Sequence, residues 1–147
     1  MAVLTVQDVS RRSGLSGSTL RYYEEVGLLG PIARDARSGH RRYRDEDLDT
    51  LQALACLRAM GVGVEDMRTY QANRQLGHSA AAEQRDLLLR HAARIDAEIA
   101  TLRIHLEYLR AKAALWDARD REDADEEAEA NLRVQGMIPR LQEVVPR

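Results

Sequence analysis

Apolar residues recur at alternating spacings of four and three along one long segment of the chain. The series covers four heptads and consists of Leu88, Ala92, Ile95, Ile99, Leu102, Leu106, Leu109, Ala113 and Trp116. This spacing predicts one face of a long helix, the a/d seam of a coiled coil. Because the residues before it form too small a domain to cover so long a seam, the pattern favours pairing with a second subunit over folding back onto the same chain.

Two short helices separated by a glycine-containing turn are predicted near the start of the sequence. Thr5 is a suitable N-cap for the first helix, and Gly14 ends it. Ser16 or Ser18 can cap the second helix, which Gly27 closes in the C′ position. Two helices joined in this way are typical of a helix-turn-helix.

The pattern changes over residues 30–44, where short runs replace the helical spacing. The runs at 32–34 and 41–43 flank a turn, which predicts a two-stranded wing. Asp45 can cap the helix that follows, because leucines at helical spacing begin directly after it. A fourth helix is predicted over about residues 64–75, with two acids in its first turn.

Charge is polarised along the chain, although its 147 residues carry a formal net charge of only −2. Residues 1–44 contain eight arginines against four acids, whereas residues 117–147 contain five arginines against nine acids. The basic N-terminal part, called the head below, is suited to binding phosphate, and the acidic C-terminal part, called the tail, is suited to remaining in solvent. The tail composition favours a flexible segment with a frayed helix near 122–132 over an ordered ligand pocket. Such a pocket would be completed by Leu132, Val134, Met137, Ile138 and Leu141.

Arginines and tyrosines gather beside glycines between residues 19 and 44. An arginine can bind a phosphate with two parallel hydrogen bonds, a tyrosine can donate its hydroxyl from a stiff ring, and a glycine lets the backbone approach the duplex closely. This combination of side chains predicts a DNA-binding surface.

The composition argues against several other classes of protein. Cys56 is the single cysteine, so neither an intrachain disulfide nor a multi-cysteine metal site is expected. His91 and His105 lie about 21 Å apart along a helix, so they cannot share a metal ion within one subunit. No nucleophile and base pair and no phosphate-cradling glycine loop is visible, so we expect neither an enzyme nor a cofactor. The sequence shows no membrane-spanning apolar run and no signal-peptide layout, which indicates a cytoplasmic protein.

Three motifs in combination resemble the MerR family of bacterial transcription regulators. They are Thr19-Leu20-Arg21-Tyr22-Tyr23-Glu24 with Gly27-Leu28-Leu29, then Gly39-His40-Arg41-Arg42-Tyr43, and then Asp47-Leu48, Leu51, Leu57-Arg58 and Gly61. The resemblance covers about residues 3–75. It implies a mainly all-α fold, with a winged helix-turn-helix DNA-binding domain over 1–75, a coiled-coil dimerisation helix over 76–116, and the acidic C-terminal tail over 117–147.

The resemblance also implies a mechanism. A homodimer joined by an antiparallel coiled coil would bind a palindromic element of double-stranded promoter DNA and distort its spacer so that RNA polymerase can engage. The family's contact residues correspond to Ser18, Thr19, Arg21, Tyr22 and Tyr23 in or beside the major groove, and to His40, Arg41, Arg42 and Tyr43 on the flanking backbone. For Tyr23, packing in the core is the competing interpretation.

The sequence leaves the trigger of such a regulator open. Cys56 lies in a segment similar to a subgroup of the family that responds to reactive aldehydes and thiol stress, and it shares a helix face with Gln52 rather than with the leucines. It is a sensor candidate for an electrophile, although free cysteines are also common packing residues. A small ligand bound near Trp116, Met137 and Ile138 is the alternative trigger. A helical adaptor that binds only proteins is the alternative without DNA.

Overall fold

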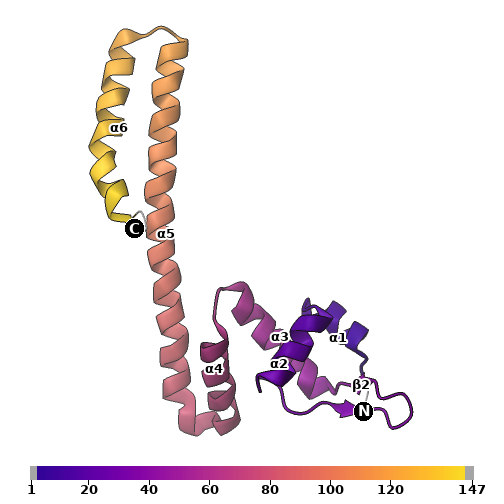
Figure 1. The fold of residues 1–147 in the computed structure, drawn as a ribbon. Helices are drawn as coiled ribbons and strands as arrows, with labels where there is room; N and C mark the ends of the chain where they lie inside the picture. Colours follow the sequence, from indigo (N-terminus) through magenta and orange to yellow (C-terminus); the bar gives the residue numbers. More distant parts are fainter. Residues whose placement is uncertain (1–2, 145–147) are drawn as a thin grey trace. The chain divides into compact units, whose positions relative to one another are not determined.

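The computed structural model describes residues 3–144, and they are mainly helical, as the sequence predicts (Figure 1). The elements in chain order are α1 (Val6–Ser13), α2 (Gly17–Glu25), β1 (Ala33–Arg34), β2 (Arg41–Arg42), α3 (Asp45–Ala59), α4 (Val64–Leu76), the 3₁₀ helix η1 (Gly77–Ala80), α5 (Ala81–Asp120) and α6 (Ala124–Val144). The chain divides into two compact units, Met1–Leu89 and Arg90–Arg147.

Polar side chains fix the ends of the first two helices, as predicted. The Thr5 hydroxyl accepts from the Asp8 N–H at 3.1 Å, and the Asp8 carboxylate accepts from the Thr5 N–H at 3.0 Å, which completes a capping box. Gly14 ends α1 with a left-handed φ of 77°. Ser16 caps α2 by accepting from the Thr19 N–H at 3.2 Å, which decides between the two candidate serines. The turn between α1 and α2 is therefore short and well defined.

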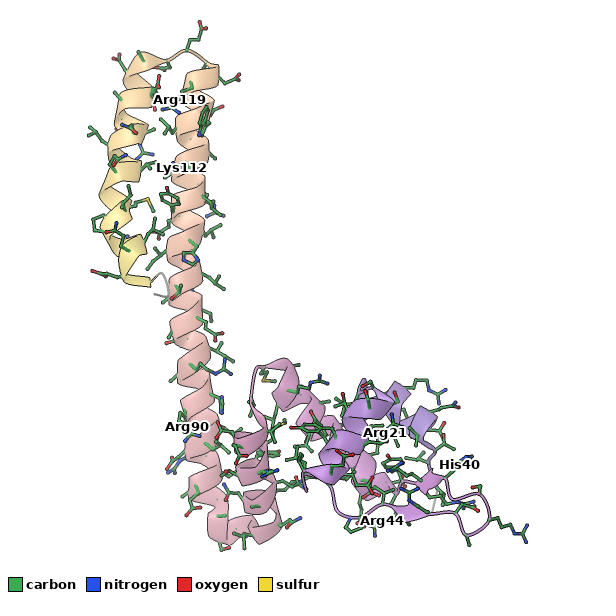
Figure 2. All side chains as sticks on the ribbon, viewed as in Figure 1. Arg21, His40, Arg44, Arg90, Lys112 and Arg119 are labelled. Carbon is green, nitrogen blue, oxygen red and sulfur yellow. The ribbon has the colours of Figure 1, made fainter. Side chains whose placement is uncertain are left out.

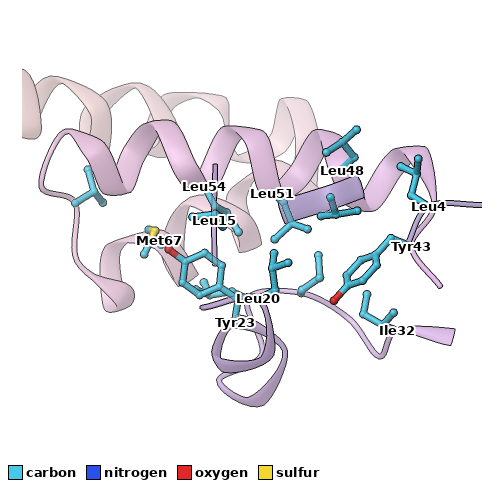
Figure 3. Close-up of a cluster of buried hydrophobic side chains, with 14 residues drawn as sticks. Leu4, Leu15, Leu20, Tyr23, Ile32, Tyr43, Leu48, Leu51, Leu54 and Met67 are labelled. Atoms are coloured by element: carbon cyan, nitrogen blue, oxygen red, sulfur yellow. The ribbon is translucent and has the colours of Figure 1, made fainter. Parts of the chain in front are cut away.

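One hydrophobic cluster holds α1, α2, α3 and the wing together (Figure 3). It consists of Leu4, Val9, Leu15, Leu20, Tyr23, Leu28, Leu29, Ile32, Tyr43, Leu48, Leu51, Leu54, Val62 and Met67. Leu51 and Leu54 of α3 and Leu20 of α2 have no exposed surface. Because the cluster takes up the inner face of α2, the polar residues on its other face remain in solvent.

The wing has the two antiparallel strands that the sequence predicts, in the register Ala33 with Arg42 and Arg34 with Arg41. A third segment, which was not predicted, joins it: the N–H of Leu4 donates to the carbonyl of Tyr43 at 2.9 Å, and the reverse bond is also 2.9 Å. This antiparallel bridge attaches the N-terminal segment to Tyr43, the residue that follows β2.

The start of α3 differs from the predicted cap by one residue. Arg44, not Asp45, occupies the N-cap position, and its N–H donates to the Asp47 carboxylate at 2.9 Å. Asp45 is the first residue of the helix itself. The acids of the first turn thus satisfy a free N–H and interact favourably with the helix dipole.

The N-terminal unit extends beyond α4 into the first turns of α5. The buried Asn73 of α4 donates from its side-chain nitrogen to the Gln84 side-chain oxygen at 3.2 Å, and Gln84 donates to the Tyr70 carbonyl at 3.0 Å. These hydrogen bonds fasten α4 to α5. The compact N-terminal unit ends at Leu89.

The C-terminal unit is a helical hairpin, in which α6 runs back alongside the second half of α5 (Figure 1). Ala111, Leu115 and Ala118 of α5 are buried, as are Ala130 and Val134 of α6. The prediction of a largely flexible tail with a short frayed helix is wrong for the described residues, since 124–144 form one helix. Small side chains at helical spacing let α6 approach α5 closely, and this burial stabilises a segment whose composition is strongly acidic.

The predicted seam of α5 lies on a face that α6 does not cover. Leu102, Leu109 and Trp116 are 62%, 65% and 62% exposed, in contrast to the buried Ala111 and Leu115. An exposed apolar stripe of this length is unusual for a monomer. Within residues 3–144, no helix is long and apolar enough to cross a membrane.

Candidate nucleic-acid interface

The second helix of the helix-turn-helix presents a polar outer face. Ser18, Arg21 and Tyr22 are exposed, whereas Leu20 and Tyr23 point into the core. Arg21 lies on this helix (Figure 2), and within the described residues it forms no salt bridge. A free guanidinium, a hydroxyl and an exposed phenol on one short helix can all donate hydrogen bonds to DNA.

Two tyrosines predicted to contact DNA are core residues instead. Tyr23 is 2% exposed and Tyr43 is 1% exposed, and both belong to the hydrophobic cluster (Figure 3). Burial raises the pKa of both phenols, so their neutral form is favoured. The structure therefore corrects two expectations: that Tyr23 lies in or beside the major groove, and that Tyr43 contacts the flanking backbone. For Tyr23 it supports the competing interpretation of core packing.

The charged residues of the wing carry internal ion pairs. Arg41 donates from Nε to Glu24 Oε2 at 2.8 Å, and Arg42 pairs with Asp35. His40 is exposed and directly precedes β2. The wing thus brings His40, Arg41 and Arg42 together, and two of the three are oriented by carboxylates.

Asp35 organises the turn between the two strands. Its Oδ1 accepts from the N–H groups of Arg37 and Ser38 at 2.7 and 3.0 Å. These backbone hydrogen bonds, with a further contribution from Arg42, lower the pKa of Asp35. Gly39 closes the turn with a φ of 72°, a value that glycine adopts without strain.

We expect the wing turn to loosen at low pH. Since the pKa of Asp35 is lower in the folded chain than the usual value of about 3.9, the turn is stabilised above that value and loses this stabilisation as the pH falls through the folded pKa. NMR titration of the Arg37 and Ser38 amide protons measures the effect. Asp35→Asn keeps an acceptor oxygen without a titrating proton, so it should hold the turn and abolish the pH dependence. A pH dependence retained in this variant would contradict the prediction.

Arg58 is a residue of this surface that the sequence alone did not assign to DNA. It lies at the end of α3, 39 positions from Thr19, yet its Nη1 is 3.5 Å from the Thr19 hydroxyl. Both residues line a groove of about 410 Å³ between the start of α2 and the α3–α4 turn, with Ser18, Tyr22 and Val64 also among its walls. The motif containing Arg58 was visible in the sequence, but only folding places this arginine beside α2.

Cys56 is exposed on α3, as its position off the leucine face predicts. Among residues 3–144, no group of three or more histidines, cysteines and acids is arranged to hold a metal ion. His91 and His105, both on α5, are partly exposed. The structure therefore shows that the Cys56 thiol is accessible, and its sensing role stays a prediction.

Comparison with known proteins assigns the family. Residues 4–74 match the model of the MerR HTH family regulatory proteins. An uncharacterized HTH-type transcriptional regulator of Haemophilus influenzae is 30% identical over 112 residues, which are 76% of this chain and 82% of that protein. The chain belongs to the MerR family. The HTH-type transcriptional regulator HmrR of Rhizobium leguminosarum bv. viciae is 34% identical over 109 residues, 72% of this chain and 83% of that protein.

A solved structure connects this MerR-family chain with DNA. HiNmlR, described as a MerR family regulator lacking the sensor domain, was crystallised bound to promoter DNA. It is 27% identical, with a TM-score of 0.68, over 88% of this chain and 96% of its own. This chain is therefore a DNA-binding transcription regulator, and its relatives are regulators rather than enzymes. The comparisons do not single out the aldehyde-responsive subgroup.

Proposed function

We propose that this MerR-family chain acts as a homodimer on a palindromic promoter element, with its heads distorting the spacer DNA so that RNA polymerase can engage. The observation that carries the proposal is the exposed apolar seam of α5. Leu102, Leu109 and Trp116 remain largely exposed although α6 packs on a neighbouring face of the same helix. An antiparallel coiled coil with a second copy would remove this stripe from water.

The proposed DNA contacts follow from exposure and from the family relationship. The outer face of α2 would enter the major groove, because its polar residues face solvent while its apolar residues hold the helix in place. The wing would contact the flanking backbone. The residues assigned to these contacts are Ser18, Thr19, Arg21 and Tyr22 on α2, His40, Arg41 and Arg42 on the wing, and Arg58 beside the start of α2.

A duplex selected from random sequence by the intact protein provides the test. We expect the selected sites to be inverted repeats and hydroxyl-radical footprints to show two protected half-sites related by a two-fold axis. Sedimentation of the free protein should give the mass of a dimer. Selection of sites with a single half-site, or a monomeric mass at micromolar concentration, would contradict the homodimer.

For the trigger, we propose electrophile modification of Cys56. The thiol is exposed and lies one helical turn after Gln52, whose side chain donates to the Arg12 carbonyl of α1 at 3.4 Å. Addition of the thiol to an aldehyde carbonyl forms a carbon–sulfur bond, and the thiol proton moves to the carbonyl oxygen. The bulkier adduct would press on the α1–α3 contact and so change how the head meets DNA.

We expect Cys56→Ser to bind the selected duplex like the wild type but to lose any response to an aldehyde. Serine is close to cysteine in size and shape and replaces the reactive sulfur with an unreactive hydroxyl, which the exposed position tolerates. Footprints with and without formaldehyde, together with the mass of the intact protein, measure this. A response that persists in the variant would move the switch elsewhere, and the next site to examine would be the groove beside Met137 and Arg133, between α5 and α6.

A further inference from the structure

Glu24 connects the recognition helix α2 to the wing through both of its carboxylate oxygens. Oε2 accepts from Arg41 Nε on β2 at 2.8 Å, and Oε1 accepts from the N–H of Ile32, which precedes β1, at 3.5 Å. The two side chains of the ion pair are only 20% and 22% exposed. A pair shielded to this extent is screened less by salt than a fully exposed one.

The position of this carboxylate is unfavourable for DNA binding on charge alone. Glu24 lies on the helix proposed to enter the major groove, so its negative charge repels phosphates, as does that of its exposed neighbour Glu25. If Glu24 favours DNA binding, it must do so through something other than its charge. The geometry supplies one, because Glu24 is the side chain of α2 that bonds to both wing segments.

The wing has few other means of keeping its orientation. Each strand contains two residues, and a two-stranded ribbon of that size is only marginally stable by itself. The backbone bridge from Leu4 to Tyr43 joins the wing to the N-terminal segment, and Ile32 and Tyr43 anchor it in the core. Among the described residues, the Glu24–Arg41 pair is the side-chain hydrogen bond that joins β2 itself to α2.

We propose that Glu24 is a positioning residue for DNA binding, which holds Arg41 and the wing at a fixed orientation relative to α2. The proposal rests on the proposed contact of the wing with the flanking backbone. It makes a counterintuitive prediction: removing this negative charge from a DNA-binding surface weakens binding to DNA.

Glu24→Gln is the decisive variant, and Glu25→Gln is its matched control. Both remove one negative charge from adjacent positions of α2 with almost no change in size. We expect Glu25→Gln to bind the selected duplex as tightly as the wild type or more tightly, since repulsion falls. Glu24→Gln should bind roughly tenfold more weakly, the loss expected when a charged hydrogen-bond partner is removed. Thermal melting followed by circular dichroism checks that both variants are folded at the assay temperature.

Hydroxyl-radical footprints distinguish positioning from a general loss of structure. Glu24→Gln should keep protection at the centre of each half-site, where α2 lies, and lose protection at the outer edge, where the wild-type wing lies. The double variant Glu24→Gln, Arg41→Gln should bind no more weakly than Arg41→Gln alone, because Glu24 acts through Arg41.

The outcomes separate this proposal from the function on which it rests. Tighter binding by Glu24→Gln, or an outer edge still protected in that variant, overturns the positioning role. Additive losses in the double variant overturn it as well. If the wild type itself shows no outer-edge protection, the proposed wing contact fails, and the positioning role falls with it.

Discussion

Leu102→Glu should convert the proposed homodimer into a monomer and weaken binding to a two-half-site duplex by about 10²- to 10⁴-fold, the advantage that linking two binding heads can give. Leu102 lies in the middle of the a/d seam and is 62% exposed in the single chain. Pairing with a second copy would bury it, and a glutamate there would place an unpaired charge in an apolar interface. Sedimentation gives the oligomeric state, and titration of the duplex gives the affinity.

Leu132→Glu is the matched control for this substitution. Leu132 is 73% exposed on α6 and lies outside the seam, so the same change in charge and shape should leave the dimer and its affinity unaltered. A duplex with one half-site provides the second control, because the Leu102→Glu monomer keeps its head intact. Its binding to the single half-site should match that of one wild-type head. If Leu102→Glu stays dimeric, the seam is not the dimer interface.

Local signals in the sequence were sufficient to predict the elements of the head. Gly14 and Gly27 mark the ends of α1 and α2 because each adopts a positive φ that other residues rarely take. The short runs on either side of Gly39 indicated the wing, and leucines at helical spacing indicated α3. Each of these features depends on residues only a few positions apart, which is the range over which sequence patterns are informative.

Features that depend on distant residues could not be predicted in the same way. The Glu24–Arg41 pair joins residues 17 positions apart, and Arg58 approaches Thr19 across 39 positions. The helical spacing placed Tyr23 on the same face as Leu20, whereas the family's contact pattern assigned it to DNA. Because Tyr23 is buried in the structure, it is a core residue. The composition of α6 is strongly acidic, and its narrow apolar stripe, which includes Val134, was therefore not recognised as a packing face. The stripe is buried only because α5 lies beside it.

The affinity of the intact dimer for its duplex should fall by about 10³- to 10⁵-fold as the salt concentration rises from roughly 50 to 200 mM, if six to ten phosphates are neutralised. The basic residues that would neutralise these phosphates lie in the N-terminal unit, since residues 1–44 carry eight arginines against four acids. Each arginine bound to phosphate releases counterions from the duplex, so the slope of log affinity against log salt counts the contacts. Titrations at several salt concentrations give this slope.

Arg42→Gln tests which residues contribute to that slope. Arg42 is exposed on the wing, and its partner Asp35 also bonds to two backbone amides, so the turn should keep its form without the arginine. One lost phosphate contact per subunit should lower the magnitude of the slope by about two for the dimer. Arg133→Gln on α6 removes the same charge away from the proposed DNA surface and should leave the slope unchanged. Equal slopes for Arg42→Gln and the wild type would show that Arg42 serves the wing turn alone, and the backbone contacts would then have to come from His40 and Arg41.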